Sequence, residues 1–251
     1  IGFSRPADEG AAEPRVRQVS ALATATDGAL WIGTAAGGLL CWRQGRLAPA
    51  EGALGASGLA ITALALDRDG VLWVGTRQRG IYRLDGTTLR HVTAADGLPT
   101  NQVSALTADP QGGVWVSTAD GRLSRWTAAG AGPPIVPGPG PAHSVRMALR
   151  DRTGGLWLGV SGSEMDELLG DFMYSVSVRH PGGGSYDLTS FTPGVQEEPV
   201  PPLSMLEDRC GPVWIGTRKG LLRVSEGRME ILSAGDGLPD DGITCLLEDR
   251  E

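Results

Sequence analysis

The chain is poor in the residues from which metal centres and nucleophilic sites are usually built. It has three cysteines and three histidines among 251 residues. Cys41, Cys210 and Cys245 lie far apart, without the close spacing of zinc ligands, and their odd number argues against a complete disulfide framework. We expect them to be small buried residues. The sequence therefore predicts no metal, no cofactor and no catalytic residue.

Positive charge and long apolar runs are also scarce. The formal net charge is −7, which disfavours nucleic acid as a partner because phosphate binding needs a basic face. No apolar run approaches the roughly 20 residues that a helix needs to cross a bilayer. These two absences exclude the nucleic-acid-binding and membrane-spanning classes for the residues present.

Tryptophan and glycine, by contrast, recur at fixed intervals. Similar phrases surround each repeated tryptophan, such as G-A-L-W-I-G-T at 28–34 and G-V-L-W-V-G-T at 70–76. The repeated tryptophans are Trp31, Trp73, Trp115, Trp157 and Trp214, with three gaps of 42 residues and a last gap of 57. Such a period is the strongest single sign of a repeat architecture. We expect the rings to be the structural core of the repeats, each contributing roughly 2–3 kcal/mol by burial between neighbouring repeats.

Each repeat has the pattern of four short strands. In the second repeat the strands are predicted over 61–66, 71–76, 81–84 and 88–93, with Asp-Gly turns typical of hairpins. Four-stranded antiparallel sheets repeated radially every 40–50 residues form a β-propeller. The predicted fold is therefore all-β, a propeller of about five four-stranded blades plus the first strand of a sixth, in an incomplete ring.

The repeats also predict the domain organisation. Residues 1–18 form an N-terminal segment, and blades are expected to start near 19, 61, 103, 145, 203 and 243, with an insertion within 161–202. The next tryptophan of the series would fall at position 255. This, with the start on Ile1, leads us to expect a fragment of a longer protein. The insertion is either a tolerated surface loop or a place where this chain differs in function.

One set of polar residues is a candidate ligand-binding site. Loops between second and third strands, together with loops that enter first strands, open on one face of a propeller around the channel. Six polar residues occupy these loops: Arg77, Arg79, Asn101, Gln102, Arg218 and Lys219. We hypothesise that they bind an anionic or polyhydroxylated ligand such as an acidic oligosaccharide, with arginine making bidentate contacts. The alternative is that they are ordinary solvated charges.

Catalysis has little support in the sequence. His91, His143 and His180 occupy unrelated positions in the repeats, and only His143, near the start of a first strand, could face the channel as in a propeller lyase. An aspartate recurs six residues before most of the repeated tryptophans, as in Asp67 and Asp208. One carboxylate per turn is too few for calcium, so we expect these aspartates to cap turns.

The repeat phrase resembles that of the two-component regulator propeller family. It runs here from D-G-L-P at 96–99 through Val103, Leu106, Asp109 and Trp115 to Thr118, and the resemblance covers roughly 19–160 and 203–250. Ser117 and Val160 depart from the usual glycine and threonine of the phrase.

The resemblance implies a ligand-sensing propeller that is not itself catalytic. Relatives form the extracytoplasmic, periplasmic part of inner-membrane receptors of the two-component or diguanylate cyclase type. It further implies a small-molecule or oligosaccharide ligand, more blades and an output module in the same polypeptide, and a homodimer in the full receptor. Two alternatives stay open: a propeller lyase or hydrolase, and a protein–protein interaction scaffold.

Overall fold

The protein consists of five four-stranded antiparallel sheets in which the strands neighbour one another in chain order. The structure is a computed structural model that describes residues 18–50, 52–55, 58–134, 143–165, 172–179, 189–191, 202–226 and 228–248. Short 3₁₀ turns, η1 (Gly52–Gly55), η2 (Ala94–Asp96) and η3 (Ala234–Asp236), are the helices of the described part. The predicted all-β propeller fold is confirmed.

Each sheet is one blade. Blade one contains β1 (Val19–Thr24), β2 (Leu30–Thr34), β3 (Leu39–Arg43) and β4 (Arg46–Pro49); blade two contains β5 (Ile61–Leu66), β6 (Leu72–Thr76), β7 (Ile81–Asp85) and β8 (Thr88–Val92). Blade three contains β9 (Val103–Ala108), β10 (Val114–Thr118), β11 (Leu123–Thr127) and β12 (Gly130–Ala131). Blade four contains β13 (His143–Arg150), β14 (Leu156–Met165), β15 (Phe172–Arg179) and β16 (Thr189–Phe191). Blade five contains β17 (Ser204–Glu207), β18 (Val213–Thr217), β19 (Gly220–Ser225) and β20 (Arg228–Leu232).

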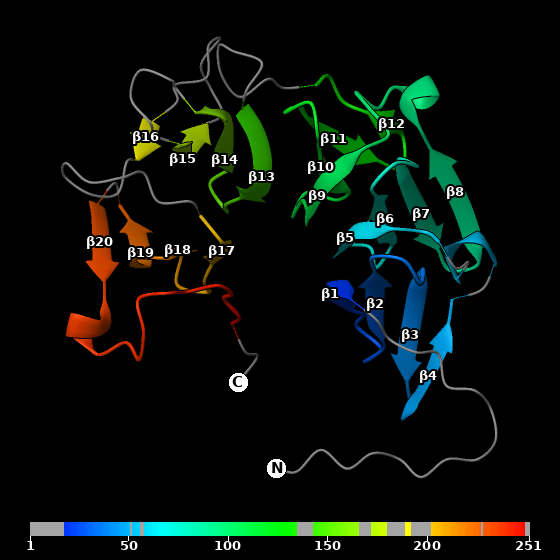
Figure 1. The fold of residues 1–251 in the computed structure, drawn as a ribbon, viewed down its shortest axis with the longest axis horizontal. Coiled ribbons are helices and arrows are strands. Elements are labelled where there is room, and N and C mark those ends of the chain that lie inside the picture. Colours follow the sequence, from blue (N-terminus) through cyan, green and yellow to red (C-terminus); the bar gives the residue numbers. More distant parts are fainter. Residues whose placement is uncertain are drawn as a thin grey trace.

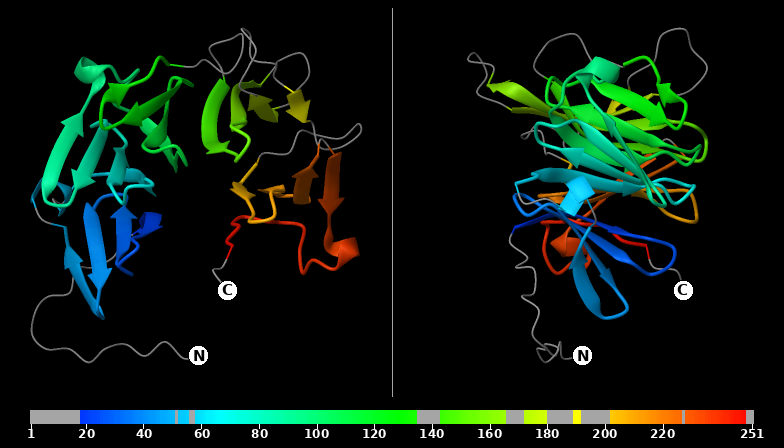
Figure 2. Two further views of the ribbon diagram at one scale, coloured as in Figure 1. Left: turned by 180° about the vertical axis from the view of Figure 1, so that it is seen from behind. Right: turned by 90° about the vertical axis from the view of Figure 1, so that its right-hand side faces the viewer.

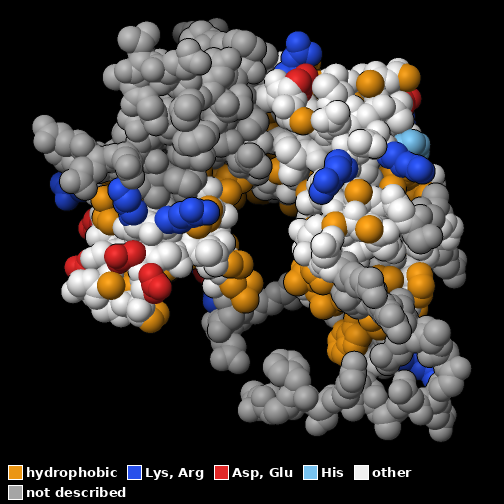
Figure 3. Space-filling view, viewed as in Figure 1, with side chains coloured by type: hydrophobic (Ala, Val, Ile, Leu, Met, Phe, Trp, Pro, Cys, Tyr) orange, Lys and Arg blue, Asp and Glu red, His pale blue; other side chains and the backbone are white. Residues whose placement is uncertain are grey.

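The blades follow one another around a central opening. The first strand of each blade lies nearest the centre and the later strands lie outside, as Figure 1 shows and the view from behind in Figure 2 repeats. Blades one and five face each other across a gap, so the ring is not closed, as predicted. The opening remains in the space-filling view (Figure 3).

Neighbouring blades pack closely because the second strand of a blade carries glycine at the contact. A Cβ on Gly75 would lie 2.7 Å from Val103 Cγ1 of the next blade, and one on Gly33 would lie 2.6 Å from Ile61 Cγ2. Without these Cβ atoms, the next first strand can approach the sheet. A side-chain hydroxyl then joins adjacent first strands: Thr62 Oγ1 donates to the Val103 carbonyl at 2.8 Å.

The fourth blade is the irregular one. β14 has 10 residues and β15 has 8, whereas β6 and β7 have 5 each. Part of the inserted sequence in 161–202 therefore lengthens the second and third strands instead of forming a loop. Residues 189–191 of the insertion form β16, and residues 166–171, 180–188 (with His180) and 192–201 lie outside the described residues.

The first strand expected at 243 is not formed within the described residues. The segment 242–248 lies along blade five, where Ile243 donates its backbone N–H to the Thr217 carbonyl at 2.7 Å. Arg209 of blade five donates its backbone N–H to Glu248 Oε1 at 2.8 Å.

The expectation of buried cysteines was wrong. Cys210 and Cys245 are exposed and Cys41 is half-buried. Cys210 lies in the turn between β17 and β18, where its backbone N–H donates to Asp208 Oδ1 at 2.7 Å. Cys245 lies in the segment after blade five. Neither position is covered by a second sheet.

Candidate functional site

The recurring aspartate and tryptophan form one unit in three of the blades. Asp67 Oδ1 accepts the backbone N–H groups of Asp69 and Val71, both at 3.0 Å, and its Oδ2 accepts the indole N–H of Trp73 at 2.9 Å. Asp151 holds Trp157 at 2.8 Å and Asp208 holds Trp214 at 2.6 Å in the same way. The aspartate thus caps the hairpin turn and also fixes the ring, a second role that sequence reasoning missed.

In blades four and five these hydrogen bonds lower the pKa of the aspartate. The hydrogen bond from the Trp214 indole, supported by backbone N–H groups, lowers the pKa of Asp208. Burial alone would raise the pKa of Asp151, but hydrogen bonds from Thr153, Trp157 and Gly155 outweigh it and leave that pKa lowered. Both shifts favour the charged form that accepts the indole N–H.

An arginine lies over the ring in three blades. Arg83 lies over Trp73 at 5.8 Å, Arg150 over Trp115 at 5.6 Å and Arg223 over Trp214 at 5.8 Å, distances typical of cation–π contacts. Trp73, Trp115 and Trp157 are buried, whereas Trp31 and Trp214 are half-buried. The ring of Trp73, 1% exposed, belongs to the core between blades two and three.

Arg77 and Arg79 lie exposed on the turn between β6 and β7. Thr76 fixes this turn, because its Oγ1 donates to the Gly80 carbonyl at 2.8 Å and accepts the Arg79 N–H at 2.9 Å. The Arg77 N–H donates to the Ala60 carbonyl at 2.9 Å. Neither guanidinium group forms a hydrogen bond or ion pair within the described part of the chain. The backbone of this turn is therefore fixed by hydrogen bonds, while both guanidinium groups remain available to a ligand.

The loop entering blade three brings Asn101 beside this turn. The Gly80 N–H donates to the Asn101 carbonyl at 2.8 Å, and Asn101 Oδ1 accepts the Ala94 N–H at 2.7 Å. One lone pair of the side-chain oxygen is used in this way, and the amide N–H groups of Asn101 can donate to a ligand. Gln102, which is exposed, connects to the next turn, since its carbonyl accepts the Ala119 N–H at 2.9 Å.

Arg218 and Lys219 lie exposed on the equivalent turn of blade five. Thr217 Oγ1 donates to the Gly220 carbonyl at 2.8 Å and accepts the Lys219 N–H at 3.1 Å. The loop beside this turn carries Asp240 and Asp241 where the equivalent loop carries Thr100 and Asn101. These carboxylates reduce the positive potential at this turn.

The six candidate residues therefore form two groups instead of one. The β6–β7 turn and the β18–β19 turn lie on opposite sides of the central opening (Figure 1), and Lys and Arg side chains flank that opening on both sides in Figure 3. The structure brings Arg77 and Arg79 together with Asn101, and it places Arg218 and Lys219 apart from them.

His91 lies next to the first group, a position that its place in the sequence did not reveal. Its ring stacks on Tyr82 with centroids 4.2 Å apart, and its Nε2 lies 2.6 Å from the Arg79 carbonyl oxygen. The sequence feature that could have revealed this position is the pairing of the third and fourth strands of the blade, in which Tyr82 lies opposite His91. His143 opens β13, but its side chain lies outside the described residues.

Within the described residues there is neither a candidate metal site nor a helix that could span a membrane. No group of three or more His, Cys, Asp or Glu side chains there could hold a metal ion. None of the described helices has both the length and the apolar character of a membrane span.

Comparisons with known proteins agree with the geometry. Residues 55–78 and 97–120 match the two component regulator propeller model. Among solved structures, the chain is similar to the extracellular domain of the putative hybrid two component system BT4673 from B. thetaiotaomicron, with 20% identity and a TM-score of 0.66 over 90% of this chain. The chain spans only 29% of the length of that domain. A sequence comparison with curated proteins gave no match.

Propellers of other functions have a similar fold. Virginiamycin B lyase from Staphylococcus aureus is 15% identical, with a TM-score of 0.64 over 86% of this chain and 69% of the lyase. PorZ, a component of the type-IX secretion system of Porphyromonas gingivalis, is 15% identical with a TM-score of 0.64 over 91% of this chain and 35% of PorZ. Such identities show the fold alone: the chain is a β-propeller, and two of its repeats, at residues 55–78 and 97–120, match the two component regulator propeller model.

Proposed function

We propose that this propeller is the ligand-sensing part of a bacterial signal-transduction receptor and is not itself catalytic. The ligand is an anionic or polyhydroxylated molecule, such as an acidic oligosaccharide, bound at the turn of Arg77 and Arg79 with Asn101 and Gln102. The proposal rests on Arg77 and Arg79. Their guanidinium groups form no hydrogen bond or ion pair in the described part of the chain, and the backbone of their turn is already fixed by hydrogen bonds.

The chemistry of this turn suits an anion. A guanidinium group presents donors in a planar fork that matches a carboxylate or sulfate in two hydrogen bonds. The hydrogen bonds of Thr76 set the turn before any ligand arrives, so less conformational entropy is lost on binding. The turn of Arg218 and Lys219 lies beside Asp240 and Asp241, so we propose a weaker second contact there.

The receptor context is part of the same proposal. Similar structures include extracellular domains of hybrid two component systems that are several times longer than this chain. We therefore propose an extracytoplasmic location, in the periplasm for an inner-membrane receptor, with further blades and an output module in one polypeptide. A homodimer of the full receptor would place two such faces near one another.

Calorimetry on the 251-residue chain tests the binding face. Oligogalacturonate and a sulfated oligosaccharide serve as probes, with inorganic sulfate as the control for a bare anion. We expect Arg77→Ala and Arg79→Ala each to weaken binding by at least tenfold, Arg218→Ala to weaken it less, and Arg68→Ala, an exposed arginine on a different turn, to leave it unchanged. Equal affinity of all four variants would show that the charges are only solvated.

Experiments on the same chain distinguish the sensor from the two alternatives, a propeller lyase and a protein–protein interaction scaffold. A propeller lyase would turn over a substrate, and His143→Ala would abolish that turnover. An interaction scaffold would form a stable complex with a protein partner in the absence of any small ligand. Either result, together with unchanged glycan binding in the arginine variants, would replace the sensor proposal.

A further inference from the structure

Blade one lacks the two groups, an aspartate and a cross-strand arginine, that contact the tryptophan in blades two and five. Position 25, six residues before Trp31, is alanine, so the aspartate that accepts the indole N–H in blades two, four and five has no counterpart here. The cross-strand partner of Trp31 is Cys41, and the partner of Cys41 on the next strand is Ala48. The ring of Trp31 is thus bordered by a thiol and a methyl group.

Blades two and five fill this space with long polar side chains. In blade two the same row across the sheet is Trp73, Arg83 and Arg90, and in blade five it is Trp214, Arg223 and Glu230. In both, the arginine lies over the tryptophan ring at 5.8 Å. The replacement of arginine by cysteine in blade one removes the group that would cover Trp31.

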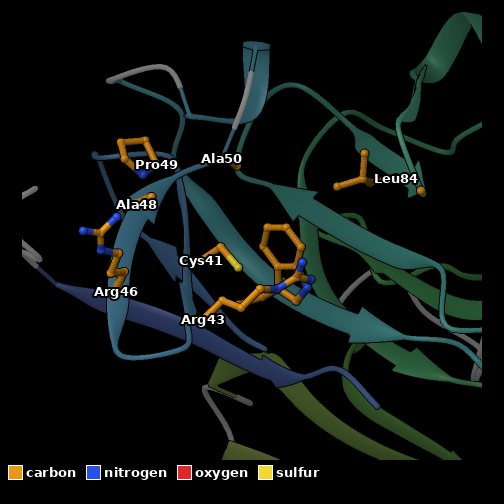
Figure 4. A pocket seen from close by; sticks show the side chains of 9 residues that line it. Cys41, Arg43, Arg46, Ala48, Pro49, Ala50 and Leu84 are labelled. Atoms are coloured by element: carbon orange, nitrogen blue, oxygen red, sulfur yellow. The ribbon is translucent and has the colours of Figure 1, made fainter. Parts of the chain in front are cut away.

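A pocket of 420 Å³ lies at this position, in the size range of about 300–1,000 Å³ that is typical of small-molecule sites. Its lining includes Trp31, Cys41 and Ala48 on blade one and Leu84 on blade two. Figure 4 shows Ala48 and Cys41 on the sheet of blade one and Leu84 across from them. The walls of the pocket are therefore aromatic and apolar.

The rim of the pocket is basic. Arg43 and Arg46 line it, and none of its lining residues is acidic. Arg43 is paired with Asp27 at 2.7 Å, on the surface. Arg46 is exposed and forms no hydrogen bond or ion pair within the residues that the structure describes. A cationic ligand would suit the ring of Trp31, but two arginines at the rim oppose it.

We propose that this pocket binds a small aromatic carboxylate, whose ring packs on Trp31 and whose carboxylate pairs with Arg46. The aromatic ring occupies the space that an arginine fills in blades two and five, and stacks offset on the indole. The carboxylate accepts charge-assisted hydrogen bonds from the Arg46 guanidinium. This site lies between the outer strands of blades one and two, and it is separate from the turn of Arg77 and Arg79.

Titration of ¹⁵N-labelled protein with indole-3-acetate tests the proposal. We expect saturable shifts of the Trp31 indole N–H signal in the 251-residue chain, with the neutral indole-3-acetamide binding at least tenfold more weakly. Cys41→Arg restores the arginine of the other blades, and should abolish saturable binding without unfolding the blade. Arg46→Gln should weaken binding about tenfold, and Arg68→Gln, on a turn of blade two, should leave it unchanged.

Alkylation of Cys41 is a second readout. Burial raises the pKa of this thiol, so we expect it to react slowly with iodoacetamide, and an occupied pocket should slow the reaction at least fivefold more. The exposed Cys210 and Cys245 should react at unchanged rates and serve as controls in the same sample. Absence of saturable shifts with 10 mM indole-3-acetate, or unchanged binding in Cys41→Arg, would overturn the proposal.

Discussion

At the scale of single residues, the aspartate that precedes the tryptophan joins the hairpin turn to the blade interface. Asp67 is nearly buried and accepts three N–H groups, from two backbone positions of its turn and from Trp73. Sequence reasoning assigned only the turn to this aspartate. The indole bond could not be foreseen, because six residues separate the two side chains and only the hairpin brings them together.

This arrangement predicts a large effect of Asp67→Ala. The substitution leaves the buried Val71 N–H and Trp73 indole N–H without an acceptor, so we expect the free energy of unfolding to fall by at least about 2 kcal/mol. Urea denaturation followed by circular dichroism measures it. Asp69→Ala, which removes an exposed carboxylate from the same turn, is the control and should cost about 0.5 kcal/mol or less. Equal losses in both variants would contradict the role of the indole bond.

The lowered pKa of Asp208 predicts how stability depends on pH. Because the pKa is lower in the folded state than in the unfolded chain, its contribution is complete above the unfolded value of about 3.9 and is lost as the pH falls through the folded value. We therefore expect Asp208→Asn to lower the urea midpoint at pH 7, and the difference from the original chain to shrink as the pH falls below about 4. A difference that stays constant from pH 7 to pH 2.5 would show that the charge of Asp208 is not involved.

At the scale of the element, the blade depends on a glycine that permits close approach of the next blade. The strands predicted for the second repeat agree with β5–β8 within one residue at either end, because hydrophobic alternation and Asp-Gly turns act locally. The longer strands of blade four were not predicted. There the repeat phrase is interrupted, and pairing of β14 with β15 decides the length of both.

Gly75→Ala tests this contact between blades. The new Cβ would lie 2.7 Å from Val103 Cγ1 and 3.3 Å from Leu106 Cγ, so one of the two blades must shift. We expect a loss of about 1–3 kcal/mol in the free energy of unfolding, measured by urea denaturation. Gly235→Ala is the control, since its nearest contact would be Ser233 Oγ at 3.4 Å. A neutral Gly75→Ala would mean that the interface is loose enough to accept a methyl group.

At the scale of the whole molecule, the incomplete ring leaves the first blade with an uncovered face. Leu22 and Leu64 occupy the same position of the repeat, yet Leu22 is 57% exposed and Leu64 is 9% exposed. Leu64 packs with residues of blades one and two, while Leu22 has no preceding blade to contact. The two leucines cannot be told apart from their positions in the repeat. Their exposure differs only because of how the blades are arranged.

The two leucines should therefore respond differently to substitution. We expect Leu64→Ala to lower the free energy of unfolding by about 2–5 kcal/mol, as is usual for a buried leucine. Leu22→Ala should change it by about 0.5 kcal/mol or less. Thermal and urea denaturation of both variants measures the contrast. A large loss in Leu22→Ala would show that this face is covered in solution.

The two proposed ligand sites likewise combine features that are set within one repeat with features that depend on the arrangement of the blades. The fixed turns of Thr76 and Thr217 follow from the repeated phrase, so the position of the basic residues on exposed turns could be predicted. Their separation into two groups could not, because it depends on how many blades lie between them. The pocket of blade one left a signal in the sequence, namely alanine at 25 and cysteine at 41, where the repeats of blades two, three and five have aspartate and arginine.

The sequence by itself determined the blade. The period of the tryptophan phrase, the turn residues and the alternation of apolar side chains are local patterns, and a four-stranded antiparallel sheet follows from them without any long-range information. Only the tertiary structure decided which side chains meet across blades, which face of blade one remains open, and where a pocket forms. These depend on contacts between residues about 40 positions apart, and only the packing of one sheet on the next establishes such contacts.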